Sequence, residues 1–143
     1  YCGALKNVCA IAVGVGQGLK LGDNAKGSIL TLGLAEMARV GRVFGAKRET
    51  YYGLAGIGDL VATCTSSHSR NRYLGEQLVH NKSFEEIKKE MKGMVAEGAN
   101  TARVLHNIAE KHNLKLPLTE QVYEIIYKGK NVEKAVKDLL TSL

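Results

Sequence analysis

The chain has 143 residues, 45% of them hydrophobic and 24% charged, which is the size and composition of one globular domain. No apolar stretch reaches the roughly 18 residues needed to cross a bilayer, so no membrane insertion is predicted. The formal net charge of +6 favours anionic partners. The three cysteines form no CxxC pair, which indicates a reducing, cytoplasmic setting and argues against a disulfide scaffold or a metal site.

Helical periods of apolar residues dominate the first half of the chain. One helix is predicted over residues 4–19. A second begins near Asp23 or Asn24, either of which is a good N-cap, and ends at Gly45. Glycine interrupts the segment 51–61, and a polar stretch then leads into a short helix predicted over residues 70–79.

The second half of the chain is also predicted to be helical. Ser83 and Glu86 form a capping box that opens a helix through Met91. Further helices are expected at residues 101–112, at 120–128 with Thr119 as the cap and Gly129 as the stop, and after Asn131. Residues 1–143 are therefore predicted to form a single all-α domain of about seven helices with short connections.

Three glycines near the N-terminus, Gly14, Gly16 and Gly18, invite comparison with a dinucleotide-binding loop. The spacing is not GxGxxG, and the residues before it are helical rather than a strand. Each glycine costs a helix about 1 kcal/mol relative to alanine, so close helix packing is the expected compensation. Glycines at positions 27, 33 and 41 suggest that the second helix crosses the first at short distance.

The segment 56–72 holds the densest group of polar residues. Asp59 either caps the residues that follow it or orients a neighbouring cation in a cleft. Ser69 is a plausible N-cap, and the first turn after it would present free N–H groups beside Arg70 and Arg72. Such a turn is suited to a phosphate, and the alternative is a solvated basic turn.

Lys6 is the one charged residue before Lys20. A lysine at a helix start is mildly unfavourable because the helix dipole prefers cations at the other end. Lys6 either extends to water or serves as a general acid or base in a site.

The stretches "GALKNV", "GDNAKGSILTLGLAEMARVGRVFGA", "GLAGIGDLVATCTSSHSRNRYLG" and "VAEGANTA" resemble the C-terminal domain of bacterial-type NAD(P)-dependent glycerol-3-phosphate dehydrogenases. The resemblance covers nearly the whole chain. It implies a multi-helix substrate domain like the C-terminal domain of 6-phosphogluconate dehydrogenase, normally preceded by a Rossmann domain. Because the chain begins at Tyr1 rather than Met, we expect it to be part of a longer protein that is inactive without that domain.

The resemblance implies hydride transfer between NAD or NADP and the pair dihydroxyacetone phosphate and sn-glycerol 3-phosphate, which feeds phospholipid synthesis. It assigns Lys6 as the catalytic proton donor and acceptor. The remaining assignments are substrate binding for Lys6, Asp59, Ser69, Arg70 and Asn71, and cofactor binding for Arg70, Val95 and Glu97. At this motif the family often has "VVEG" where this chain has "VAEG".

Two other classes of function remain open from the sequence. One is another two-domain dehydrogenase, against which the phosphate-type "SRN" cluster argues. The other is a basic helical module for nucleic acid, against which an aromatic content of 6% without tryptophan argues, so no nucleic-acid partner is predicted. A dimerisation role for the glycine-bearing second helix is compatible with the dehydrogenase function and would make the protein a homodimer.

Overall fold

The computed structural model describes residues 2–47, 54–66 and 69–142. Within these ranges all of the regular secondary structure is helical, as predicted. The elements are α1 (Cys2–Gly18), α2 (Asp23–Val43), the π-helical turn η2 (Leu54–Gly58), α3 (Asp59–Thr65), α4 (Arg70–Leu78), α5 (Phe84–Glu90), α6 (Glu97–His112), α7 (Pro117–Tyr127) and α8 (Val132–Thr141). Residues 51–53 and 67–68, which fall in the segments that the sequence marks as glycine-interrupted and polar, lie outside the described residues.

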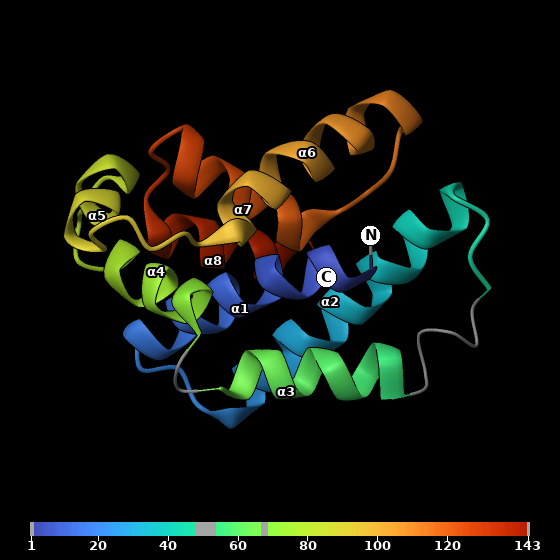
Figure 1. The fold of residues 1–143 in the computed structure, drawn as a ribbon, viewed down its shortest axis with the longest axis horizontal. Coiled ribbons are helices and arrows are strands. Elements are labelled where there is room, and N and C mark those ends of the chain that lie inside the picture. Colours follow the sequence, from blue (N-terminus) through green and yellow to red (C-terminus); the bar gives the residue numbers. More distant parts are fainter. Residues whose placement is uncertain (1, 48–53, 67–68, 143) are drawn as a thin grey trace.

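Helix α1 is the centre of the fold. It contacts α2, α3, α4, α6 and α7, and Figure 1 shows it crossing the middle of the molecule with the other helices around it. Its side chains from Val8 to Val13 are almost wholly inaccessible to solvent. This burial explains the long run without charge in the sequence, because an ionised side chain in the middle of α1 would be removed from water.

Gly14 and Gly18 serve close helix packing, as predicted, although the partner is α4 rather than α2, whereas a Cβ at Gly16 would make only an ordinary contact at 3.5 Å. A Cβ at Gly14 would overlap the backbone carbonyl of Arg72, and a Cβ at Gly75 would overlap the carbonyl of Ile11. In α2, a Cβ at Gly33 would overlap the Cys9 sulfur on α1, whereas Gly27 faces open space. The expected close crossing of α1 and α2 therefore holds at Gly33 and is wrong at Gly27.

Several predicted helix ends are confirmed. Gly45 has a positive φ of 79°, and the amides of Gly45 and Ala46 bond back to the last turn of α2. The hydroxyl of Ser83 accepts the Glu86 amide at 3.1 Å, and the Asn131 side chain accepts the Lys134 amide at 3.0 Å. Helix α6 begins at residue 97, four residues before its predicted start.

Thr119 is not the cap of α7, so that prediction is wrong. The helix begins at Pro117, whose missing N–H is not needed at the first position. The buried carboxylate of Glu36 on α2 takes the capping role: it accepts the Leu118 amide at 2.7 Å, the Thr119 amide at 3.1 Å and the Thr119 hydroxyl at 2.8 Å. Burial raises the pKa of Glu36 above its usual value, while these hydrogen bonds act in the opposite direction.

Candidate functional site

Lys6 and Asp59 form an ion pair, with 2.8 Å between Nζ and Oδ2. Lys6 lies near the start of α1, and Asp59 is the first residue of α3, directly after the π-helical turn. Gly58 occupies the N-cap position of α3 without a side-chain bond, so Asp59 orients a cation instead of capping its helix. Both side chains remain partly exposed, at 28% for Lys6 and 42% for Asp59, so a substrate could reach the pair.

A polar pocket of about 500 Å³ lies beside this pair. Its lining gathers residues from four helices and two connections: Asn7, Ala62, Thr63, Ser66, Ser69, Arg70, Asn71, Val95 and Glu97. Five of the seven residues predicted for the site therefore meet here. Lys6 and Asp59 do not line the pocket, but Asn7 follows Lys6 in α1, and Ala62 and Thr63 lie one helical turn beyond Asp59 on the same face of α3.

The start of α4 provides the anion-binding geometry of the pocket. Ser69 is the N-cap, and its hydroxyl accepts the Arg72 amide at 3.2 Å. The first turn of this nine-residue helix carries N–H groups that lack intrahelical partners, together with the positive end of its dipole. The side chain of Arg70 is exposed and has no polar partner among the described residues. These features favour a phosphate.

Asn71 is held in one orientation by a bond between two helices. It is buried, and its Oδ1 accepts the Gly98 amide at 2.9 Å, so the start of α4 is fixed to the start of α6. Since an amide N–H must face an oxygen, the side-chain NH₂ of Asn71 is left as a donor. Asn71 therefore both aligns the two helix starts and presents N–H groups at the pocket that it lines.

Val95 and Glu97 also line the pocket. Val95 is 62% exposed in the connection before α6, and Glu97 is the first residue of that helix. The sequence did not point to Asn7, Thr63 or Ser66 as lining residues. Thr63 could have been found from helical spacing, because it lies four residues after Asp59. Asn7 could have been found as the residue that follows Lys6.

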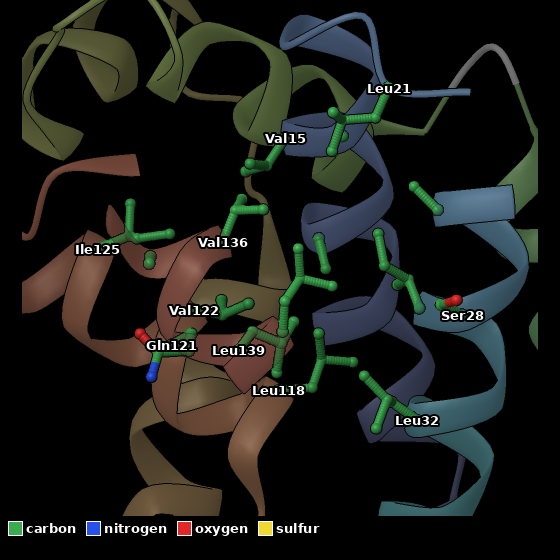
Figure 2. Close-up of a pocket in the computed structure, with 16 residues that line it drawn as sticks. Val15, Leu21, Ser28, Leu32, Leu118, Gln121, Val122, Ile125, Val136 and Leu139 are labelled. Atoms are coloured by element: carbon green, nitrogen blue, oxygen red, sulfur yellow. The ribbon is translucent and has the colours of Figure 1, made fainter. Parts of the chain in front are cut away.

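A second pocket lies between α1, α2, α7 and α8 and has a different character. Figure 2 shows aliphatic side chains from these helices, among them Val15, Leu32 and Leu139, directed toward one another. The volume is about 180 Å³, and the lining includes no charged residue. A phosphate ester would lose its hydration there without gaining a cation or a helix N-terminus, so this pocket does not suit a phosphorylated substrate.

The cysteines Cys9 and Cys64 have structural positions. The thiols of Cys9 and Cys64 are buried, and burial raises the pKa of Cys64 to about 12 and that of Cys9 well above its usual range, so neither is a nucleophile at neutral pH. Within residues 2–47, 54–66 and 69–142, no three His, Cys, Asp or Glu side chains gather as metal ligands. No helix in those ranges has the length and apolarity to span a membrane.

Solved dehydrogenase structures share this architecture. The chain is 45% identical to glycerol-3-phosphate dehydrogenase from Coxiella burnetii, with a TM-score of 0.91, and the match covers 97% of this chain and 42% of that one. The corresponding enzyme from Saccharomyces cerevisiae is 34% identical, with a TM-score of 0.86 over 97% of this chain and 41% of that one. The fold is thus that of the helical domain of these dehydrogenases.

Residues 1–137 match the family described as NAD-dependent glycerol-3-phosphate dehydrogenase C-terminus, and the chain belongs to this family. Among curated relatives, glycerol-3-phosphate dehydrogenase [NAD(P)+] 1 of Salinibacter ruber is 51% identical over 97% of this chain. The enzyme of Bacillus mycoides is 47% identical over 96% of this chain. In both cases this chain spans 40% of the relative's length.

Proposed function

We propose that this chain is the substrate-binding domain of an NAD(P)-dependent glycerol-3-phosphate dehydrogenase that interconverts dihydroxyacetone phosphate and sn-glycerol 3-phosphate. The observation that carries the proposal is the meeting of Ser69, Arg70 and Asn71 with Val95 and Glu97 around one pocket, beside the Lys6–Asp59 pair. A Rossmann domain in the rest of the protein would hold the dinucleotide. A cytoplasmic location and a homodimer remain predictions.

Lys6 is the proposed proton donor in the reduction direction. When a hydride adds to C2 of the ketone, the C2 oxygen gains negative charge, and an ammonium within hydrogen-bond reach stabilises that charge and delivers the proton. Asp59 contacts Lys6 at 2.8 Å and fixes the position of Nζ. In the oxidation direction Lys6 accepts the proton from the C2 hydroxyl.

The phosphate of the substrate would bind at the start of α4. The free N–H groups of the first turn, the Arg70 guanidinium and the Asn71 amide all supply donors there. Contacts to a phosphate remote from the reacting carbon provide binding energy that positions C2 next to Lys6.

Val95 and Glu97 suit the proposed cofactor contacts. NAD or NADP supplies the hydride when bound. Val95 offers an exposed apolar surface for a ring, and the Glu97 carboxylate accepts hydrogen bonds from amide or hydroxyl groups. Arg70, the first residue of α4, is proposed to contact both substrate and cofactor.

Steady-state assays test this proposal. The complete protein, with its dinucleotide-binding domain, should oxidise NADH or NADPH in the presence of dihydroxyacetone phosphate and saturate with that substrate. The purified 143-residue chain should leave NADH absorbance unchanged under the same conditions. Absence of any oxidation that depends on dihydroxyacetone phosphate in the folded complete protein would contradict the proposal.

A further inference from the structure

Arg70 and Arg72 lie in the first turn of α4 but differ in their exposure to solvent. Arg70 is exposed and lines the pocket. The side chain of Arg72 is only 13% exposed, and Arg72 does not line the pocket. The two guanidinium groups that the sequence placed together in one anion site are therefore separate, and Arg72 requires its own explanation.

Arg72 bonds to both described residues that flank positions 67–68. Its Nη1 donates to the carbonyl oxygen of Ser66 at 2.7 Å, and its backbone N–H donates to the Ser69 hydroxyl at 3.2 Å. Ser66 and Ser69 both line the polar pocket. One residue thus contacts both Ser66 and Ser69 without itself lining the pocket.

Arg72 is itself anchored on the central helix α1. Its Nη2 donates to Oε1 of Gln17, and its backbone carbonyl packs against Gly14, where a side chain would not fit. Glu76 lies 3.8 Å from the same Nη2. The Nε atom is buried without a partner among the described residues. Keeping an incompletely paired guanidinium in this position is costly, which argues for a role beyond packing.

We infer that Arg72 is a positioning residue for the phosphate end of the substrate. By holding Ser66 and Ser69 against α1, it sets the direction in which the first turn of α4 and Arg70 face the pocket. The planar fork of the guanidinium reaches the Ser66 carbonyl and Gln17 at once, and a lysine ammonium cannot reproduce that geometry. This inference rests on the proposed function.

Arg39 provides a matched control. Its Nη1 donates to the carbonyl of Lys115 at 2.9 Å, so it also joins a helix to a distant connection through a backbone carbonyl. This contact lies between α2 and the segment before α7, and neither residue lines the polar pocket. Replacing Arg39 removes a bond of the same chemical kind without disturbing the proposed site.

The test compares Arg72→Met, Arg72→Lys and Arg39→Met in the complete enzyme. We measure kcat, the KM for dihydroxyacetone phosphate, the inhibition constant of inorganic phosphate, and the melting temperature. Both Arg72 variants should raise the KM and the phosphate inhibition constant by the same factor, about tenfold, which is the loss expected from one charge-assisted hydrogen bond. The value of kcat should change less than threefold. Arg39→Met should change only the melting temperature.

Two results would overturn the inference. One is a folded Arg72→Met enzyme with the KM and phosphate inhibition constant of the wild type. The other is an equal rise of both constants in Arg39→Met, which would show a general loss of stability. Arg70→Ala in the same assays distinguishes failure of the phosphate site from failure of the role of Arg72. If the KM is unchanged in both Arg70→Ala and Arg72→Met, the proposed phosphate site is wrong. If the KM rises in Arg70→Ala but not in Arg72→Met, only the role of Arg72 is rejected.

Discussion

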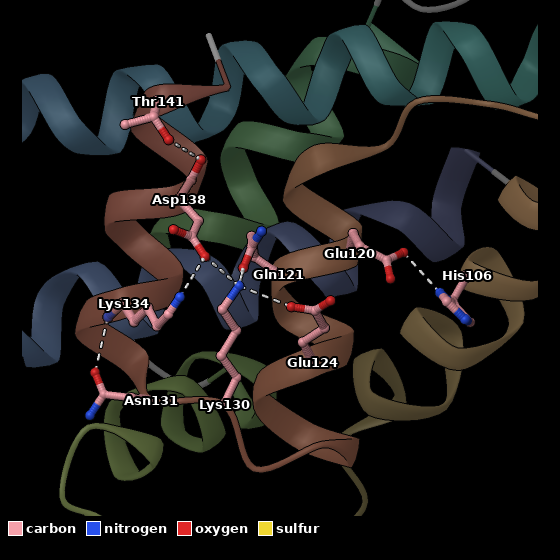
Figure 3. A network of polar contacts seen from close by, with 9 residues as sticks. All are labelled: His106, Glu120, Gln121, Glu124, Lys130, Asn131, Lys134, Asp138 and Thr141. Atoms are coloured by element: carbon pink, nitrogen blue, oxygen red, sulfur yellow. Dashed lines mark hydrogen bonds and ion pairs between the residues drawn. The ribbon is translucent and has the colours of Figure 1, made fainter.

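Lys6 and Lys130 both contact carboxylates, yet their surroundings differ in a way that separates a site from a structural network. Lys130 contacts Asp138 at 2.7 Å, Gln121 at 2.7 Å and Glu124 at 3.0 Å, and Figure 3 shows these groups joining α7 to α8. Hydrogen bonding to Asp138, followed by Glu124, raises the pKa of Lys130. Each of its three ammonium protons has an acceptor.

Lys6 has one carboxylate partner among the described residues and lies beside a polar pocket. Two of its ammonium protons are left for other acceptors. The same contrast separates the buried carboxylate of Glu36, which receives three hydrogen bonds within the protein, from Asp59, which is 42% exposed. Lys130 and Glu36 direct their polar bonds to other parts of the protein and hold the fold together, whereas Lys6 and Asp59 keep bonding capacity beside the pocket.

The largest effect should follow from Lys6→Ala in the complete enzyme. Without the ammonium, the developing charge on the C2 oxygen has no donor, and kcat should fall by at least about a hundredfold. Lys6→Arg should restore little activity, because a guanidinium resists deprotonation and has another shape. Lys130→Ala is the matched control and should leave kcat near the wild-type value. Steady-state kinetics measures kcat, and circular dichroism confirms folding. A folded Lys6→Ala enzyme with the kcat of the wild type would contradict the proposed role of Lys6.

Arg70→Ala should weaken binding of the phosphorylated substrate. Loss of one charge-assisted contact costs about 1.5–3 kcal/mol, which corresponds to a rise in KM of roughly tenfold to a hundredfold. A comparable exposed arginine, Arg103 on α6, lies over the Tyr127 ring away from the polar pocket. Arg103→Ala should leave KM unchanged. An equal rise in KM for both substitutions would show that Arg70 acts only through the positive charge of the surface and does not contact the phosphate.

The close contact of α1 with α4 should respond to Gly14→Ala. The added methyl group would overlap the Arg72 carbonyl, so the helices must separate at a cost of about 1–3 kcal/mol in unfolding free energy. Gly27→Ala on α2 meets open space and should stabilise the chain by up to about 1 kcal/mol, because alanine has the higher helix propensity. Denaturant unfolding of both variants measures the difference, and effects of the same sign would refute this view of the packing.

The smallest effect concerns the pH dependence contributed by Glu36. Its pKa is raised by burial in the folded state, so folding favours the protonated carboxyl. Its contribution to stability is therefore complete below the unfolded pKa, near 4.5, and is lost as the pH rises through the folded pKa. The difference in unfolding free energy between wild type and Glu36→Gln should fall across that window. If this difference in unfolding free energy stayed constant from acid to neutral pH, the raised pKa of Glu36 would be contradicted.

Much of this molecule could be predicted because the relevant information is local. The period of α1, the glycine after α2, and the caps Ser69, Ser83 and Asn131 all depend on residues within a few positions of one another. The Ser69 cap and the basic turn with Arg70 could be predicted for the same reason, whereas Asn71, Val95 and Glu97 are assigned only through the resemblance of "SRN" and "VAEG" to the family.

The failures involve partners that are distant in sequence. Glu36 caps α7 across 82 residues, and nothing near Thr119 indicates this. The choice of α4 as the partner of Gly14 depends on three-dimensional packing, and so does the separation of Arg72 from Arg70. Helical periodicity identifies a buried face but does not identify the helix that covers it.

A crystal structure of the complete enzyme with sn-glycerol 3-phosphate and its oxidised dinucleotide would test the central claim most directly. The account predicts phosphate oxygens within hydrogen-bond distance of the α4 first-turn amides and of Arg70, with the C2 hydroxyl against Nζ of Lys6. A phosphate bound elsewhere on the domain, with Lys6 remote from C2, would contradict it.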